Sequence, residues 1–394
     1  MQNEKTYVAS EPYAIMAKPV GSRCNLRCPY CYYLKTHSLE RADASIMNEE
    51  TLEAFLVSFI ASSPGPIIQI VWHGGEPTLA GLSFYRKAVE LERKHLPEGW
   101  EIWNNLQTNG LLLDDEWCTF LNEEGFDVGL SVDGSKWLHD KNRTDLGGRP
   151  TYKKVSQACA LLRKHGIKPD LLCTVTQETA EKPLAAYQSL KGLGTGWMQF
   201  IPIVIWGEGG RIEKGSVSAL SYGKFLCAVF DEWATHDIGR IGVQLFAEMS
   251  LVLRGVRSSV CWMAPTCGRV AVVEVDGSVY SCDHFVNEGH RIGSVFEGNL
   301  ARIVDSDAQT RFGREKKEGL SQKCLSCEWA GLCNGGCPKD WADLDGQKVN
   351  CLCEGLRYFY AHSVEPLKRI LGALDREEPV LRVQQKMRAE LGKL

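Results

Sequence analysis

Three cysteines near the start of the chain have the spacing of a metal-binding loop. Cys24, Cys28 and Cys31 form the pattern C-x3-C-x2-C directly after an apolar run. Three thiolates can hold three irons of a 4Fe-4S cluster, and the fourth iron, which normally takes a fourth cysteine, is then open to a small ligand. An open iron is a reaction site. A zinc site and three buried thiols without metal are alternatives to an iron-sulfur cluster, because the spacing alone fits all three.

A second group of cysteines occupies the last third of the chain. Its spacing is C-x5-C-x14-C, then C-x2-C-x5-C-x3-C, then C-x-C, and its members are Cys261, Cys267, Cys282, Cys324, Cys327, Cys333, Cys337, Cys351 and Cys353. Eight thiolates suffice for two fully ligated 4Fe-4S clusters, which leaves one cysteine surplus. A pair of zinc sites is the alternative. Four isolated cysteines on apolar stretches are expected to be buried core thiols, namely Cys118, Cys159, Cys173 and Cys227.

Alternating strand-like and helix-like segments must position these loops. The candidate strands are residues 14–19, 67–72, 101–107, 127–132, 168–176 and 197–201. Helix-like stretches such as residues 81–96 lie between most of them. This alternation predicts an α/β fold with a parallel sheet, and six units indicate a partial (β/α)6 barrel whose active residues lie at the carboxyl ends of the strands.

The alternation fades after about residue 235, where the cysteine-rich segment begins. We therefore expect a barrel domain over residues 1–235, a small cysteine-rich domain over 236–355 and a C-terminal helical segment over 356–394. A helix should begin near Glu354, because Leu356, Phe359 and Tyr360 are spaced for one buried face. The charged stretch 377–394 should form a peripheral helix.

Composition excludes several classes of function. The chain has 394 residues, 44% of them hydrophobic, and a formal net charge of -4 with both signs mixed, so it has no basic footprint for nucleic acid. It has neither a secretory signal nor an apolar run long enough for a membrane span, so we expect a cytoplasmic protein. In such a protein clustered cysteines indicate metal rather than disulfides.

Motifs at three predicted strand ends accompany the first cysteine loop. These are Gly74-Gly75-Glu76-Pro77, Gln107-Thr108-Asn109-Gly110 and Ser131-Val132-Asp133-Gly134, with Arg143 a little beyond. Taken singly, each could be an ordinary turn. Together with the C-x3-C-x2-C loop they resemble the radical S-adenosylmethionine superfamily. The resemblance implies that S-adenosylmethionine chelates the open iron and that Gly74, Gly75, Glu76, Gln107, Ser131 and Arg143 surround it.

The second cysteine group resembles the SPASM domain, a twin-cluster extension of peptide-modifying radical enzymes. The resemblance implies that Cys261, Cys267, Cys282 and Cys337 hold one auxiliary cluster, and that Cys324, Cys327, Cys333 and Cys353 hold the other. The chain would thus carry three 4Fe-4S clusters. Cys353 is preferred to its neighbour Cys351 because the residues after it resemble the closing helix of that domain.

Within the superfamily the chain resembles the anaerobic sulfatase-maturating enzymes, through the strings at residues 72–81, 106–110 and 276–283. This implies oxidation of a Cys or Ser side chain of an unfolded sulfatase to Cα-formylglycine. Asp283 corresponds to the general base, and Tyr33 is a candidate substrate contact. The auxiliary clusters would accept the second electron, and a flavodoxin or ferredoxin would donate electrons. Without the resemblance, Asp283 would read as a turn-capping aspartate.

Two other functions compete with this one. A different peptide maturase, such as a thioether-forming enzyme, shares the barrel and the cysteine pattern, but only about a dozen residues precede the first strand, too few for a leader-binding domain. An iron-sulfur electron carrier is the noncatalytic alternative. A carrier gains nothing from an open iron, so the three-cysteine loop favours an enzyme.

Overall fold

The computed structural model describes residues 7–35, 46–344 and 346–392. The chain forms two compact units that interleave along the sequence. The first unit comprises Met1–Ser131, Arg143–Pro169 and Thr266–Glu315, and the second comprises Val132–Asn142, Asp170–Pro265 and Lys316–Leu394. The linear division at residues 235 and 355 stays a prediction. Within the described residues, no helix combines the length and the apolar character needed to cross a membrane.

A mixed sheet forms the centre of the first unit. Its parallel strands are β1 (Ala14–Ala17), β2 (Ile67–Trp72), β3 (Glu101–Thr108) and β4 (Asp127–Ser131). On the other side of β1 lies the parallel strand β8 (Val270–Val273), and β9 (Ser278–Tyr280) and β10 (Arg291–Ser294) continue the sheet antiparallel. The strand order is β10-β9-β8-β1-β2-β3-β4. The carboxyl ends of β1 and β8 are therefore neighbours.

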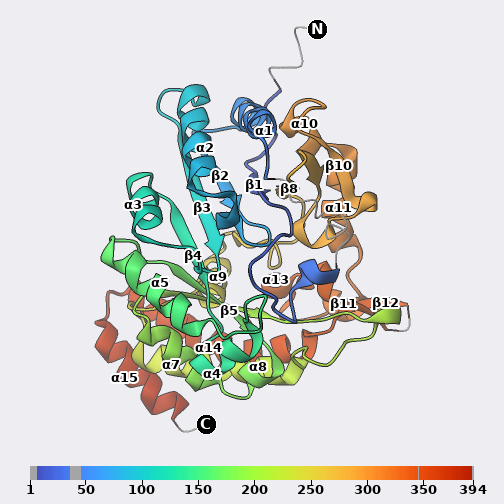
Figure 1. Cartoon of the computed structure of the whole chain (residues 1–394). Helices are drawn as coiled ribbons and strands as arrows, with labels where there is room; N and C mark the ends of the chain where they lie inside the picture. The colour runs from blue at the N-terminus through green and yellow to red at the C-terminus, as the bar shows by residue number, and fades with distance from the viewer. Residues whose placement is uncertain (1–6, 36–45, 345, 393–394) are drawn as a thin grey trace. The chain divides into compact units, whose positions relative to one another are not determined.

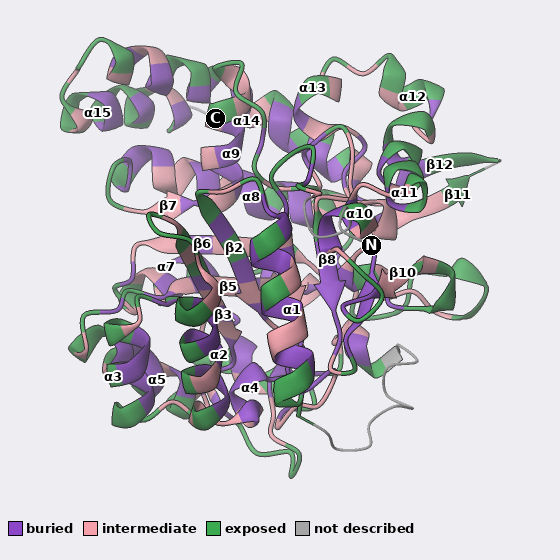
Figure 2. Cartoon of the chain, turned by 90° about the horizontal axis from the view of Figure 1, so that it is seen from above, coloured by how far each residue is buried: buried purple, intermediate pink, exposed green. Residues whose placement is uncertain are grey.

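Amphipathic helices cover this sheet. They are α1 (Glu49–Ser62), α2 (Leu82–His95), α3 (Asp115–Glu123), α5 (Tyr152–Lys164) and α10 (Leu300–Val304). Helix α11 (Asp307–Glu318) begins in this unit, and its residues from Lys316 on belong to the second unit. The Asn48 side chain caps α1 by accepting from the backbone N–H of Thr51 (2.8 Å). Figure 2 shows buried residues along one side of α1 and exposed residues along the other. Figure 1 shows α1 and α2 beside β1, β2 and β3.

Strand periodicity explains the core of the first unit. Alternate residues Ile68, Ile70 and Trp72 of β2 are buried, as a strand covered on that face requires. The Trp72 indole lies edge-on to Phe55 and Tyr85 and donates to Oδ1 of Asn104 (2.8 Å). The polar atom of the largest core side chain is thus satisfied.

The second unit contains three further parallel strands, β5 (Asp170–Val175), β6 (Trp197–Pro202) and β7 (Gly242–Val243). Its helices are α4 (Lys136–Asn142), α6 (Gln177–Ala180), α7 (Pro183–Gly192), α8 (Ala219–His236), α9 (Gln244–Leu253), α12 (Gln322–Leu325), α13 (Ala330–Cys333), α14 (Cys353–Asp375) and α15 (Val380–Leu391). Strands β11 (Trp341–Leu344) and β12 (Gln347–Asn350) form a hairpin.

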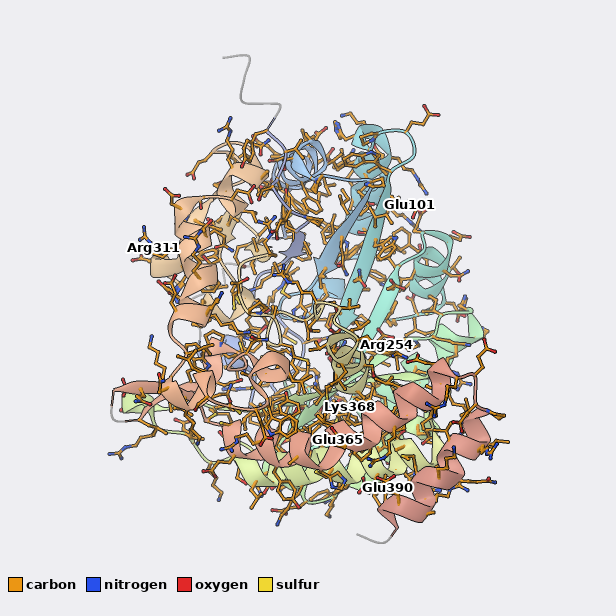
Figure 3. The ribbon with its side chains drawn as sticks, turned by 180° about the vertical axis from the view of Figure 1, so that it is seen from behind. Glu101, Arg254, Arg311, Glu365, Lys368 and Glu390 are labelled. Atoms are coloured by element: carbon orange, nitrogen blue, oxygen red, sulfur yellow. The ribbon has the colours of Figure 1, made fainter. Side chains whose placement is uncertain are left out.

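The C-terminal helices pack on the body of the second unit. α14 lies against α8, and α15 lies against both. Arg369 of α14 donates through Nε to Glu390 of α15 (3.1 Å), and Figure 3 labels Glu390 together with Glu365 and Lys368 on α14. A buried face formed by Leu356, Phe359 and Tyr360 starts α14, as the sequence predicted.

The α/β class and all six predicted strands are confirmed, each within two residues of its expected ends. Two features went unforeseen. Strand β8 lies in the cysteine-rich segment yet pairs with β1, and β9 and β10 extend the same sheet. The four isolated cysteines are buried, as expected.

Candidate active site and cluster-binding cysteines

The first cysteine loop leaves β1 and brings its three thiols together. The backbone N–H of Cys31 donates to the carbonyl of Cys28 (3.0 Å), which closes a tight turn. Burial, followed by the negative charges of Glu76, Cys28 and Cys31, raises the pKa of the Cys24 thiol to about 12. Such thiols ionise only beside a strongly positive group, and iron is one. The donor set therefore fits an iron-sulfur cluster.

Glu76 ties the ends of β2 and β3 together. It is 1% exposed, and its Oε1 accepts from the N–H and hydroxyl of Thr78 and from the hydroxyl of Thr108, while Oε2 accepts from the N–H of Asn109 (2.7 Å). Asn109 in turn donates to Oδ1 of Asn25 in the cysteine loop (2.7 Å). Glu76 thus organises the strand ends.

Gly74 and Gly75 allow β2 to approach the cysteine loop. Gly74 has φ +116°, and a Cβ there would lie 2.6 Å from the Gly21 carbonyl oxygen. A Cβ on Gly75 would lie 2.1 Å from the Arg23 carbonyl oxygen. Side chains at either position would displace the loop. The close backbone approach in this structure is therefore to the loop, and contact with a cofactor stays a prediction.

Two of the other predicted cofactor residues, Gln107 and Ser131, lie at strand ends of the first unit. Gln107 donates to the hydroxyl of Ser131 (3.0 Å) across the ends of β3 and β4. The Arg143 guanidinium lies 5.7 Å from the centre of the Tyr30 ring, and its charge acts on Cys31. All these groups belong to one unit, together with the three thiols.

Asp283 lies in a buried charge cluster at the carboxyl ends of β1 and β8. The Lys18 ammonium, which is 0% exposed, contacts Oδ1 of Asp283 at 2.6 Å and Oε1 of Glu274 at 2.9 Å. One ammonium therefore bridges two buried carboxylates. Lys18 follows β1 and Glu274 follows β8, so the pairing of these strands creates the cluster.

Two tyrosines complete the surroundings of Asp283. The hydroxyl of Tyr33 donates to Oδ1 (2.9 Å) and that of Tyr32 donates to Oδ2. Nδ1 of His73 accepts the backbone N–H of Gly74 (2.8 Å) and lies 3.3 Å from the Tyr33 hydroxyl. Because a carboxylate is the stronger acceptor, the single Tyr33 proton belongs to Asp283.

The charges in this cluster decide the protonation of Asp283. Burial acts to raise its pKa, but the charge of Lys18, helped by His73 and His284, outweighs burial and holds the pKa well below its usual range. For Lys18, burial acts to lower the pKa, and the charges of Asp283 and Glu274 reverse this and raise it. Burial raises the pKa of Glu274 despite Lys18. Asp283 is thus the ionised partner of a charged lysine.

Cys267 and Cys282 lie in the first unit. Gln309, which is 1% exposed, donates to the carbonyls of Gly268 (2.9 Å) and Ser281 (3.1 Å), so one amide joins the segments that carry the two cysteines. Cys282 immediately precedes Asp283, which starts a short 3-10 turn over Asp283–Phe285. The predicted base and a predicted cluster ligand are therefore adjacent in the chain.

Four cysteines of the second unit line one cavity. The cavity has a volume of about 200 Å³, and the cysteines that line it are Cys324, Cys327, Cys333 and Cys353. Burial and the proximity of Cys353, Cys324 and Cys327 raise the pKa of Cys333 to about 12. Cys351 lies instead beside Asp340 and Lys339. This geometry supports the choice of Cys353 over Cys351.

Cys261 and Cys337 also belong to the second unit, and they are close enough for their charges to interact. In the part of the chain that the structure describes, no group of three or more His, Cys, Asp or Glu side chains is arranged to hold a single metal ion. Four thiols around one cavity match the four cysteine ligands of a 4Fe-4S cluster.

Sequence reasoning missed Lys18, Glu274 and Tyr32. A signal for Lys18 was present, because a lone lysine directly follows the apolar strand β1, at the end where barrel enzymes carry their active residues. Glu274 had no such signal, since β8 was not predicted.

Comparisons with known proteins show the family of this chain. The family model described as Radical SAM superfamily matches residues 19–190, and the one described as SPASM, an iron-sulfur cluster-binding domain, matches residues 261–328. The chain is 38% identical to a serine-type anaerobic sulfatase-maturating enzyme of Bacteroides thetaiotaomicron, over 90% of each chain. It is 34% identical to a cysteine-type enzyme of Clostridium perfringens, over 89% of this chain and 96% of that one.

Solved structures give the same result. The structure titled "Native anSMEcpe with bound AdoMet and Cp18Cys peptide" matches with a TM-score of 0.84 and 33% identity, over 92% of this chain and 99% of that one. Streptococcus suis SuiB bound to its precursor peptide SuiA matches with a TM-score of 0.59 and 16% identity, over 84% of this chain and 73% of that one, and shares the fold alone. By its sequence and fold, this chain belongs to the anaerobic sulfatase-maturating enzymes of the radical S-adenosylmethionine superfamily.

Proposed function

We propose that this enzyme oxidises a Cys or Ser side chain of a sulfatase to Cα-formylglycine under anaerobic conditions. The observation that carries the proposal is the environment of Asp283. Its carboxylate is buried, bound by Lys18 and Tyr33, and adjacent in the chain to Cys282. The relatives of both serine and cysteine type support the reaction class and leave both substrates open.

The residues for the first cofactor are those of the first unit. Cys24, Cys28 and Cys31 would hold a 4Fe-4S cluster with S-adenosylmethionine at its open iron. The Arg143 guanidinium suits the methionyl carboxylate, since Arg and carboxylate form paired charge-assisted hydrogen bonds. Gln107 and Ser131 provide hydroxyl and amide groups suited to a ribose. Glu76, whose two oxygens already accept hydrogen bonds from the strand ends, would act by holding these groups in place.

When bound, the first cluster and S-adenosylmethionine would supply the radical chemistry that removes a Cβ hydrogen, and two auxiliary 4Fe-4S clusters would supply an acceptor for the second electron. The proposed ligands are Cys261, Cys267, Cys282 and Cys337 for one of them, and Cys324, Cys327, Cys333 and Cys353 for the other.

The protein must then remove the proton of the substrate thiol or hydroxyl, and Asp283 is the proposed base. Its depressed pKa keeps it ionised and ready to accept at every physiological pH. Oδ1 already accepts from Lys18 and Tyr33, whereas among the described residues Oδ2 accepts from Tyr32. Oδ2 is therefore the less engaged oxygen and the atom that would receive the substrate proton.

Tyr33 holds the carboxylate in one orientation while its ring lies 4.7 Å from the Lys18 ammonium. We propose that it also limits the position of the substrate side chain, as its place beside the cysteine loop suggested. The remaining partners would be an unfolded sulfatase segment, which must enter as an extended chain, and a flavodoxin or ferredoxin as electron donor in the cytoplasm.

The test uses reconstituted protein kept anaerobic with reductant and S-adenosylmethionine, and peptides containing Cys-x-Pro-x-Arg or Ser-x-Pro-x-Arg. Mass spectrometry should detect an aldehyde together with 5'-deoxyadenosine in equal amount. Asp283→Asn should keep the release of 5'-deoxyadenosine and lose most of the aldehyde. Normal aldehyde formation by that variant would remove Asp283 as the base, and a thioether product would redirect the enzyme to another class of peptide.

A further inference from the structure

A buried lysine outside the proposed active site holds the loop of Cys261. Lys316, near the end of α11, is 1% exposed. Its ammonium donates to the carbonyl oxygens of Cys261 (3.0 Å), Trp262 (2.9 Å) and Ala264. An ammonium has three protons, and these three carbonyls match them in number. Such a contact costs the ammonium its water, so the loop must hold these carbonyls in a fixed arrangement.

The other peptide groups of the same loop are also engaged. The carbonyl of Met263 accepts from Nδ2 of Asn334 (2.7 Å), and the N–H groups of Met263 and Ala264 donate to the carbonyl of Val260 (3.1 and 3.2 Å). Just before the loop, Glu248 of α9 accepts from the N–H of Ser259 (2.8 Å). The turn that carries Cys261 is therefore fixed from both ends.

Lys316 also sets the electrostatic surroundings of the Cys261 sulfur. Its ammonium lies 3.0 Å from the carbonyl oxygen of Cys261, which places a positive charge close to the residue that carries the sulfur. The backbone N–H groups of Cys261 and Trp262 interact with the sulfur as well. The carbonyls of Cys261 and Trp262 accept from Lys316, and the N–H groups of the same two residues interact with the sulfur. The peptide dipoles of the loop and the ammonium therefore both favour negative charge on the sulfur.

We propose that Lys316 is a positioning residue for one auxiliary cluster, fixing the Cys261 loop and raising the reduction potential of the cluster that Cys261 would hold. The inference rests on the proposed assignment of Cys261 as a ligand. A fixed positive charge beside a cluster stabilises its reduced form, which carries one more negative charge. In the proposed reaction this cluster accepts one electron from the substrate, and Lys316 makes that transfer more favourable.

The test compares three substitutions in the complete, anaerobically reconstituted chain. Lys316→Gln removes the charge but can still donate two hydrogen bonds, and Lys316→Met removes both. Lys317→Met is the matched control, because Lys317 is the next residue of the same helix and is exposed. Iron content and electron paramagnetic resonance count the clusters, and a redox titration followed by the same signal gives their potentials.

We expect Lys316→Gln to keep all clusters and to shift the reduction equilibrium of one of them at least tenfold toward the oxidised form, about 59 mV for a one-electron couple. Lys316→Met should lose that one cluster or show the same shift, and Lys317→Met should match the wild type. Loss of a single cluster in both Lys316 variants also supports the proposal, because it shows the positioning role.

Unchanged iron content and potentials in both Lys316 variants would overturn the proposal, as would loss of all clusters together. The iron content of the wild-type protein distinguishes failure of the proposed function from failure of the proposal about Lys316. If wild-type protein contained no auxiliary cluster, the assignment of Cys261 would fall before Lys316 is considered.

Discussion

Replacing Lys18 by methionine tests the charge cluster around Asp283. The substitution keeps most of the buried volume and removes the ammonium that contacts Asp283 at 2.6 Å and Glu274 at 2.9 Å. Two buried carboxylates then face each other without a counter-charge. We expect the folded protein to respond by binding a proton, so that the pKa of Asp283 moves from below to above its usual range.

The magnitude follows from the burial of all three groups. Removing one partner of a buried ion pair costs about 3–5 kcal/mol, because an uncompensated charge remains in the interior. In the wild type the depressed pKa of Asp283 contributes stability above its unfolded pKa, and this is lost only as the pH falls through the lower folded value. In Lys18→Met the carboxyl pKa values are raised, so the deficit is small below about pH 4 and grows as the pH rises.

Thermal unfolding of the two proteins at about pH 5.5 and about pH 8.5 measures this deficit, which should be larger at the higher pH. Aldehyde formation by Lys18→Met should be low at neutral pH and rise with pH, since Asp283 must ionise to act. Lys87→Met is the matched control, because Lys87 also contacts two carboxylates, at 2.8 and 3.0 Å, but lies at the surface. Equal losses of stability in both variants, or a pH-independent deficit, would refute this account of the cluster.

Three further predictions concern other parts of the chain. Burial raises the pKa of Glu92 to about 7, so the free energy of unfolding should fall by up to about 3 kcal/mol as the pH rises from the usual glutamate range through this value. Glu92→Gln should abolish that pH dependence in thermal unfolding. An unchanged pH profile in the variant would contradict this. Gly75→Ala places a Cβ against the cysteine loop and should abolish cleavage of S-adenosylmethionine. Gly192→Ala is the control and should leave cleavage unchanged, because no atom lies within 4 Å of the added Cβ. A fully active Gly75→Ala enzyme would disprove the clash. Cys353→Ser should lower the iron content of reconstituted protein while Cys351→Ser leaves it unchanged, and the opposite result would exchange their roles.

The sequence predicted the framework of the fold because apolar runs and turn signals coincide in it. Residues 67–72 form a mostly apolar run that is followed closely by Gly74-Gly75, and β2 covers the same residues, Ile67–Trp72. Strand β8 was not predicted, because Val270–Val273 is only four residues long and lies among cysteines and glycines. Its place depends on pairing with β1, which is distant in sequence, and such contacts leave no local pattern.

Residue types at the proposed site were predictable where spacing constrains them. Three thiols lie within eight residues, from Cys24 to Cys31, so a single turn of the chain brings them together. The partners of Asp283 were not predictable in this way, because Lys18 and Glu274 are 256 residues apart and meet only through the sheet. The role of Glu76 as a contact of S-adenosylmethionine stays a prediction, and nothing in the sequence indicated that both of its oxygens accept hydrogen bonds from the strand ends.

The bridge between the two carboxylates explains how a carboxylate with a depressed pKa can act as a base. With Lys18 charged and both carboxylates ionised, the buried cluster has a net charge of one negative unit. Uptake of one proton from the substrate makes the cluster neutral, which a low-dielectric interior favours. The proton need not stay on Asp283, because Lys18 contacts Glu274 as well, and burial raises the pKa of that carboxyl. In the proposed reaction Lys18 would therefore keep Asp283 ionised beforehand, and Glu274 would offer the proton a carboxylate of higher pKa afterwards.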